Sequence, residues 1–174
     1  MKIIKIIGIT LLSLIGIILI IPLFLSSSFT VSRSVEVDAP KDSVYAYLSD
    51  FNNFTEWSPW AKMEKGTLKY KVAGTGVGST YSWEGNQIGK GKMTLTSLEP
   101  TVINVKMLFI APWEAEGQVQ WIVEPVGSKT KVTWNYSQGN LKYFQRYFNL
   151  TADKMMGGAF DEGLGYVKAG IEKK

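Results

Sequence analysis

The stretch VSRSVEVDAPKDSVYAYLSDFNNFTEWSPW, residues 31–60, passes from an alternating pattern to a helical one within a few positions. Apolar and polar residues alternate over residues 30–37, which predicts a half-buried strand. An Asp-Ala-Pro helix-start signal follows, and apolar residues then recur at i, i+3 and i+4, so we expect a helix over residues 41–49. Residues 50–60 predict a second, shorter helical piece that ends before Pro59, because the residue preceding a proline is disfavoured in the α region. The stretch therefore predicts a strand followed by two short helices.

A long run of alternating segments comes next, from Thr67 to Gln138. Gly-rich or Pro-containing turns such as AGTGVG, EGNQIG, EPT and EPVGS divide it. We expect six strands here, which with the first strand make seven; they cover residues 67–72, 78–85, 89–98, 101–110, 115–126 and 128–138. Long, consecutive strands favour a meandering antiparallel sheet over a βαβ arrangement.

The alternation within these strands separates an apolar face from a polar one. Lysine, asparagine and glutamine occupy the positions between the apolar ones, as expected for an antiparallel sheet with one solvated face. The apolar positions are Tyr70, Val72, Tyr81, Trp83, Met93, Leu95, Ile103, Val105, Met107, Val119, Trp121, Val123, Val132, Trp134 and Tyr136. Another element must cover this face.

The segment from about Thr151 onward is the remaining candidate for that cover. Apolar residues recur there at steps of 4, 4, 3 and 4, a helical stripe formed by Met156, Phe160, Leu164, Val167 and Ile171. We therefore expect a long C-terminal helix across the sheet. The glycine pair at 157–158 is expected to bend or interrupt it near its start, since each glycine weakens a helix interior by about 1 kcal/mol.

The N-terminus departs from this globular pattern. Residues 6–25 contain no charge, and as a helix they would extend about 30 Å, the thickness of the hydrocarbon core of a bilayer. Lys2 and Lys5 precede this run and the next charged residue is Arg33, so the positive-inside bias places the N-terminus in the cytoplasm and the folded part outside it. We expect residues 1–28 to be a single-pass membrane anchor and linker.

A cleaved signal peptide is the alternative for this segment. MKIIK fits the charged region of such a peptide, and Ser26 and Ser28 fit the small-residue cleavage positions, which would give a secreted protein. The apolar region of a signal peptide usually runs about 7–15 residues, however, and this one is longer. Residues 29–174 suit a single domain in either case.

The composition excludes several kinds of chemistry. The chain has 174 residues with no cysteine and no histidine, which removes disulfides, thiolate zinc sites and the usual general base at neutral pH. We expect no metal site and no cofactor. The net charge is +4 and its lysines are spread along the chain, whereas nucleic-acid binding requires a concentrated basic face, so we expect no nucleic-acid partner.

The order of motifs gives the chain a resemblance to a known superfamily. The opening stretch, the Gly-rich GVGSTYSWEGN and the closing DKMMGGAFDEGLGYVKAGIE resemble the START-like, Bet v 1-like superfamily, and within it the bacterial polyketide cyclase/dehydrase and lipid-transport (SRPBCC) group, over residues 30–172. The resemblance implies an α+β helix-grip fold, in which a curved seven-stranded antiparallel sheet wraps around a long C-terminal helix and leaves a hydrophobic cavity. Members bind lipids, sterols, polyketides or plant metabolites there, and a minority catalyse cyclisation, dehydration or hydrolysis. The group shares no catalytic set, so we assign no catalytic residue.

In this topology the two short helices lie at the mouth of the sheet. Trp57 and Trp60 are then expected to plug the junction where the chain turns into the second strand, with Pro59 fixing that turn. Such packing buries a large apolar area and leaves an indole N–H free to meet a loop carbonyl. The alternative is that one of the two tryptophans lines the ligand entrance.

The apolar face and the C-terminal stripe supply further candidates for the cavity wall. Bulky or flexible side chains fit either a filled core or a ligand-sized space. The candidate lining residues are Trp57, Trp60, Tyr70, Tyr81, Trp83, Met93, Val105, Met107, Trp121, Trp134, Met156, Phe160 and Leu164. The carboxylates considered for acid–base chemistry are Glu84, Glu114, Glu116, Asp161 and Glu162, and alternation places Glu84 on the solvated face opposite Trp83.

Three functions are consistent with these features. We expect a membrane-anchored carrier or sensor of a hydrophobic small molecule or lipid, with the anchor holding the cavity mouth near the bilayer. The first alternative is an enzyme on a polyketide-like or other apolar substrate, with a carboxylate or tyrosine as proton donor. The second is a closed domain that acts as an interaction module at the cell surface, which a large apolar patch outside the cavity would support.

Overall fold

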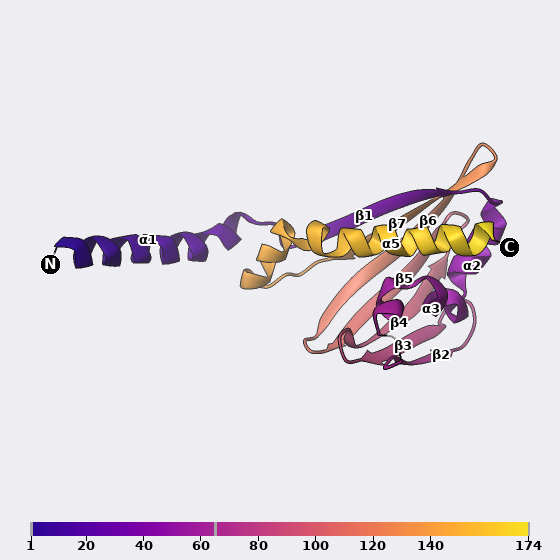
Figure 1. Ribbon diagram of the computed structural model, residues 1–174, viewed down its shortest axis with the longest axis horizontal. Coiled ribbons are helices and arrows are strands. Elements are labelled where there is room, and N and C mark those ends of the chain that lie inside the picture. Colours follow the sequence, from indigo (N-terminus) through magenta and orange to yellow (C-terminus); the bar gives the residue numbers. More distant parts are fainter. Residues whose placement is uncertain (1, 65, 174) are drawn as a thin grey trace.

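The computed structural model describes residues 2–64 and 66–173; Met1, Lys65 and Lys174 lie outside the described residues. A seven-stranded antiparallel sheet in the order β1-β7-β6-β5-β4-β3-β2 curves around the C-terminal helix α5 (Figure 1). The predicted helix-grip fold is thereby confirmed. The strands are β1 (Phe29–Val37), β2 (Lys69–Ala73), β3 (Thr80–Gly85), β4 (Gly89–Leu98), β5 (Val102–Ala111), β6 (Ala115–Val126) and β7 (Lys129–Gln138).

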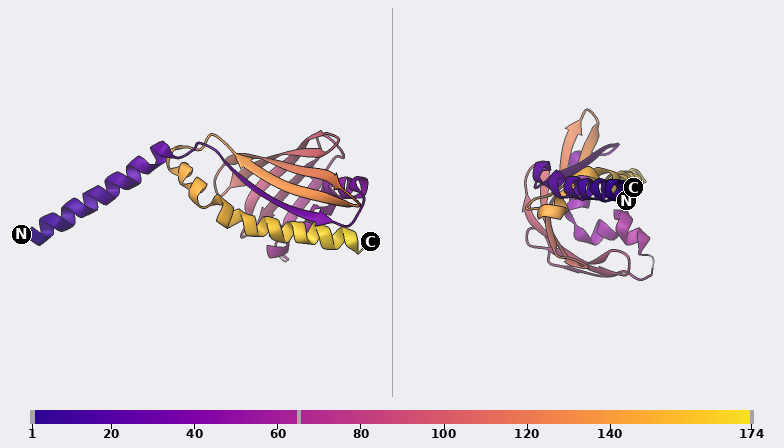
Figure 2. Two further views of the ribbon diagram at one scale, coloured as in Figure 1. Left: turned by 90° about the horizontal axis from the view of Figure 1, so that it is seen from above. Right: turned by 90° about the vertical axis from the view of Figure 1, so that its left-hand side faces the viewer.

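The concave face of the sheet carries the apolar set that alternation predicts. Trp121 of β6 lies directly opposite Trp134 of β7, and each is only 1% exposed. Lys106 and Gln118, also paired across strands, face outward between inward-facing residues. The curvature of the sheet, seen end-on in Figure 2, leaves an interior that helices must close on one side.

Helix α5 (Ala152–Glu172) closes that side and runs along β1 (Figure 2). Phe160, Leu164 and Val167 of the predicted stripe are buried. The helix continues without a break through residues 157–158, so the predicted interruption is wrong. Burial of its apolar face stabilises the helix against the loss in glycine propensity.

Gly157 makes room for an ion pair. A Cβ at this position would lie 2.0 Å from Nη2 of Arg33, which reaches from β1 to the helix. The Arg33 guanidinium contacts Asp153 (Nη1–Oδ1 2.8 Å) and Asp161 (Nε–Oδ2 3.3 Å). The hydrogen bond from Arg33 lowers the pKa of Asp153. The ion pairs therefore tie the start of α5 to the edge of the sheet.

The segment after β1 contains more helical pieces than predicted. Helix α2 (Lys41–Ser49) agrees with its predicted range, and is followed by η1 (Phe51–Asn53), α3 (Phe54–Trp57) and α4 (Pro59–Met63). Pro59 starts α4 rather than ending the helical region, because proline fits the first turn of a helix and the Ser58 side chain caps it by accepting from the Ala61 N–H.

Two further helices lie at the opposite end of the domain from α2 (Figure 1). Helix α1 (Lys2–Phe24) extends away from the sheet and is long and apolar enough to cross a membrane. The 3-10 helix η2 (Tyr143–Leu150), which was not predicted, joins β7 to α5. Asn149 Nδ2 donates to the carbonyl of Ser26 at 2.7 Å, so η2 lies beside the point where α1 ends.

Candidate functional site

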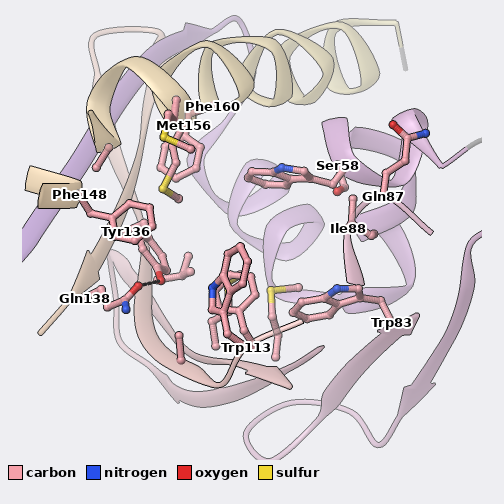
Figure 3. A pocket seen from close by; sticks show the side chains of 18 of the residues that line it. Ser58, Trp83, Gln87, Ile88, Trp113, Tyr136, Gln138, Phe148, Met156 and Phe160 are labelled. Atoms are coloured by element: carbon pink, nitrogen blue, oxygen red, sulfur yellow. Dashed lines mark hydrogen bonds between the residues drawn. The ribbon is translucent and has the colours of Figure 1, made fainter. Parts of the chain in front are cut away.

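A cavity of about 520 Å³ lies between the concave face of the sheet, α4, η2 and the first half of α5 (Figure 3). Ligand pockets typically measure roughly 300–1,000 Å³. Most of the wall is aromatic, aliphatic or methionine, and its other polar side chains are Ser58, Gln87, Gln138 and Gln145. Among residues 2–64 and 66–173, no charged side chain lines it. The cavity therefore suits an apolar occupant with few hydrogen-bonding groups.

Eight predicted lining residues face this cavity: Trp60, Tyr81, Trp83, Met93, Met107, Trp134, Met156 and Phe160. Trp83 points in from the sheet and Phe160 from α5 (Figure 3). Glycines across the sheet leave room for the aromatic wall. A Cβ at Gly91 would lie 2.1 Å from the Trp83 ring, and one at Gly117 would lie 2.4 Å from the ring of Tyr136, a further lining residue.

Five predicted lining residues lie away from the cavity. Trp57, Val105, Trp121 and Leu164 are at most 1% exposed and form the packed part of the core, where side chains from the helices after β1 fill the concave space. Tyr70 is 53% exposed because β2 is an edge strand beyond the reach of α5, and its ring stacks on Tyr81 instead. Alternation identifies the inward face, but not which part of it stays open.

Trp57 and Trp60 occupy different environments. Trp57 packs edge-to-face against Phe54, with ring centroids 4.8 Å apart, and against Trp121 and Trp134, both at 5.3 Å. Its indole N–H has no acceptor among the described residues, so the predicted bond to a loop carbonyl is not formed. Trp60 is partly buried at the cavity wall. The packing interpretation therefore applies to Trp57, and the position of Trp60 fits the entrance interpretation.

Tyr136 and Gln138, at successive inward positions near the end of β7, form a polar corner of the cavity (Figure 3). Tyr136 Oη donates to Gln138 Oε1 at 2.9 Å. Burial raises the pKa of Tyr136 to about 12 and also raises the pKa of Tyr81. Both phenols are therefore neutral near pH 7, and the Tyr136 phenol serves as a hydrogen-bonding group.

The five carboxylates considered from the sequence, Glu84, Glu114, Glu116, Asp161 and Glu162, are all exposed and lie outside the cavity wall. Glu84 pairs with Lys90 at 3.1 Å on the solvated face, as alternation predicts. Glu116 pairs with Lys106 at 2.8 Å on the same face. None of the five contributes a proton donor to the cavity.

Glu64, which sequence reasoning missed, is a buried carboxylate next to the cavity rim and is only 1% exposed. It accepts hydrogen bonds from the Thr67 hydroxyl and from the backbone N–H groups of Gln87 and Ile88, the latter at 2.9 Å. The Thr67 bond, followed by the backbone bonds, lowers the pKa of Glu64. Because Gln87 and Ile88 line the cavity, Glu64 positions the β3–β4 turn at its rim. No local pattern marks this residue, since its two backbone partners come from a turn more than twenty positions away.

The list of candidate lining residues also lacks a group on the side of the cavity nearest α1. Phe29, Trp113, Phe148 and Met155 come from the start of β1, the β5–β6 connection, η2 and the start of α5. The aromatic run YFQRYF at 143–148 was the available signal, because its aromatic residues stand at i, i+1, i+4 and i+5, a helical spacing that was not used.

A family comparison covers almost the whole folded domain. Residues 28–172 match the family model described as polyketide cyclase / dehydrase and lipid transport. No curated protein sequence matches the chain at a significant level.

Solved structures share the fold at low sequence identity. The di-domain ARO/CYC StfQ from the steffimycin biosynthetic pathway gives a TM-score of 0.65 at 12% identity, over 86% of this chain and 51% of that chain. Protein CV1439 from Chromobacterium violaceum gives 0.59 at 16% identity, over 82% of this chain and 96% of that chain. Ara h 8.0201 gives a TM-score of 0.55 at 10% identity, over 80% of this chain and 97% of that chain. These similarities concern the fold alone, and the chain spans about half the length of StfQ.

Proposed function

The chain belongs to the polyketide cyclase/dehydrase and lipid transport family, and on this premise we propose that it is a membrane-anchored binding protein for a hydrophobic small molecule or lipid. The observation that carries the proposal is the 520 Å³ cavity whose wall has no charged side chain among the described residues. The eight predicted residues that face it, from Trp60 to Phe160, are the proposed contacts, together with Phe29, Trp113, Phe148 and Met155.

The chemistry of the wall narrows the class of ligand. A charged group placed inside would lose its hydration and find no counter-charge, so the buried part of the ligand is neutral. The Tyr136–Gln138 corner offers hydrogen bonds to one polar end, such as a carbonyl or hydroxyl group. Met93, Met107 and Met156 add flexible surface that adapts to an irregular apolar shape.

Helix α1 supplies the membrane anchor in this proposal. Its length and apolar composition suit a single span, and Lys2 and Lys5 favour a cytoplasmic start with the domain outside. The alternative is a secreted domain released by signal cleavage.

The test is to compare the molecules that co-purify with three forms of the full chain in the same detergent. Ala115→Trp places a large ring in the cavity from the start of β6, and Gln118→Trp, on the outer face of the same strand, is the matched control. Organic extraction and mass spectrometry should find one apolar molecule at stoichiometric amounts in wild type and Gln118→Trp, and much less in Ala115→Trp. All three forms contain α1, so lipid that adheres to this helix contributes equally to each and does not affect the comparison. Equal amounts in three folded proteins would contradict the proposal.

An enzyme acting on an apolar, polyketide-like substrate is the second candidate. The buried Tyr136 phenol and its hydrogen bond to Gln138 favour it, since this pair could polarise a substrate carbonyl. StfQ, a structural neighbour, is described as an ARO/CYC of a biosynthetic pathway. Turnover of a synthetic poly-β-ketone that is lost in Tyr136→Phe, while binding persists, would support this candidate.

A further inference from the structure

The rim of the cavity carries exposed apolar side chains on the side nearest α1. Trp113, Phe148 and Met155 line the cavity and are nevertheless 65%, 39% and 66% exposed. Phe144 and Leu150, at 60% and 62% exposure, extend this surface along η2. These five residues are called the rim patch. Clustered exposed apolar side chains mark interaction sites rather than ordinary solvent-facing surface.

Hydrogen bonds hold the rim patch beside the end of α1. Pro22 has no N–H, so the carbonyl of Ile18, four residues earlier, lacks its usual donor within the helix. Tyr147 Oη, from η2, donates to that carbonyl at 2.6 Å. Arg146 Nη1 donates to the carbonyl of Pro22 at 3.2 Å. An unpaired carbonyl is costly in a hydrocarbon environment, so these bonds favour a fixed position of η2 against α1.

The contact lies in the last two turns of the proposed membrane span. Ile18 and Pro22 belong to the last part of the apolar run at 6–25, so the proposed anchor brings η2 to the boundary between hydrocarbon and water. Tyrosine and tryptophan are enriched at this boundary, and long basic side chains bury their stems there while the charge stays hydrated. The sequence of η2, with Tyr143, Arg146 and Tyr147 beside two phenylalanines, has this composition.

We propose that the rim patch rests in the lipid–water interface of the membrane that α1 crosses, so that the cavity exchanges its occupant directly with the lipid phase. The proposal rests on the proposed function, because it requires both the anchor and an apolar ligand. A lipid surface is the expected partner because the bonds between η2 and α1 place the patch next to the bilayer in each molecule. A second copy or another protein would have to displace lipid from that position.

The absence of cysteine from the chain allows a direct test of this placement. Phe144→Cys and Met155→Cys are labelled with nitrobenzoxadiazole in the full chain, reconstituted in phosphatidylcholine vesicles. Val77→Cys is the matched control, an apolar residue that is 60% exposed in the β2–β3 connection. Emission from both rim labels should shift to the blue and lose most of its intensity when the lipids carry shallow spin labels. The Val77 label should instead be quenched by aqueous iodide.

Two results would overturn the placement. Iodide quenching of all three labels would mean that the rim patch lies in water. A blue shift at the rim without quenching by spin-labelled lipid would mean that protein, such as a second copy, covers the patch.

The exchange route has its own measurement. Nile red carried in by vesicles should reach the cavity severalfold more slowly in Phe144→Asp/Leu150→Asp than in wild type or Val77→Asp, as followed by energy transfer from tryptophan. The amount bound at equilibrium should be unchanged, since neither Phe144 nor Leu150 lines the cavity. An unchanged rate would overturn direct exchange.

The failure of the proposed function can be distinguished from the failure of the membrane placement. If wild type and Ala115→Trp contain equal amounts of co-purified ligand while the rim labels are still quenched by lipid, the proposed function is refuted and the membrane placement stands.

Discussion

Trp57 and Trp60 are three positions apart and are expected to respond differently to truncation. Trp57→Ala removes a fully buried ring that contacts Trp121 and Trp134, so we expect the free energy of unfolding to fall by about 3–5 kcal/mol. Trp60→Ala removes one side chain from the cavity wall, so we expect a smaller loss of stability than in Trp57→Ala and weaker retention of the co-purifying molecule. Urea unfolding followed by circular dichroism, together with extraction of bound molecules, measures both effects.

Trp57→Phe is the control for the role of the indole N–H. Because this group meets no acceptor among the described residues, phenylalanine keeps most of the ring contact and loses no hydrogen bond. We expect it to cost clearly less than Trp57→Ala. If Trp57→Ala and Trp60→Ala lose equal stability and equal amounts of ligand, the assignment of Trp57 to the core and Trp60 to the cavity wall is contradicted.

Glu64 gives the domain a defined acid sensitivity. Its pKa in the folded state is lower than the unfolded value of 4.5, chiefly because of the hydrogen bond from Thr67. The carboxylate therefore contributes its full stability above pH 4.5, and this contribution is lost as the pH falls through the lower folded pKa. We expect Glu64→Gln to be less stable than wild type at neutral pH, and the difference to shrink in acid.

Urea titrations of wild type and Glu64→Gln at a series of pH values measure that difference. Asp153 also has a lowered pKa, so Asp153→Asn is the control that removes the other shifted carboxylate and leaves the Glu64 contribution in place. A gap between wild type and Glu64→Gln that stays constant into acid would show that the loss comes from packing rather than from the charge.

At the scale of the element, two glycines of α5 differ in whether there is space for a Cβ atom. A Cβ at Gly158 would meet nothing within 4 Å, so Gly158→Ala should stabilise the domain by about 0.5–1 kcal/mol through helix propensity. A Cβ at Gly163 would lie 2.8 Å from the Trp134 ring and 3.1 Å from Pro59 Cδ. Gly163→Ala should therefore destabilise it by about 1–3 kcal/mol, as overpacking does.

Thermal or urea unfolding of the two alanine variants provides the comparison. Stabilisation by both would indicate that α5 is not pressed against Trp134 and α4 as closely as the contacts at Gly163 suggest. Destabilisation by both would indicate that Gly158 has a role in the backbone that its open surroundings do not reveal.

The elements that sequence predicts well are those whose burial follows a simple period. The strands from Thr80 to Gln138 bury one face, so alternation marks both their extent and the face that points inward. Helix α5 is recognised by its stripe, but the glycine pair at 157–158 misleads, because the reason for Gly157 is the distant Arg33. Helix η2 has aromatic residues at helical spacing but is only eight residues long, and the residues of α1 that it contacts lie more than 120 positions away in the chain.

The candidate site is predicted in part for a related reason. Residues on the concave face can be identified from the sequence. Trp134 lines open space and Trp121 beside it does not, and this difference depends on which neighbours fill the interior. Phe51 and Phe54 fill it near Trp121, whereas η2 and the start of α5 leave room near Trp134. Such filling is a property of the packed molecule, and no single segment encodes it.

For the whole molecule, the anchor predicts one topology in the membrane. Ser128→Cys adds a thiol to the exposed β6–β7 turn, at the end of the sheet far from α1, and Ile3→Cys adds one at the start of α1. In intact cells a membrane-impermeant maleimide should label Ser128→Cys, because the domain is expected outside the cytoplasm. Ile3→Cys should be labelled only after permeabilisation, and the mass of the purified protein should include α1. Loss of the N-terminal segment together with labelling at residue 128 would instead establish a secreted domain, while labelling of neither in intact cells would place the cavity and its rim on the cytoplasmic side.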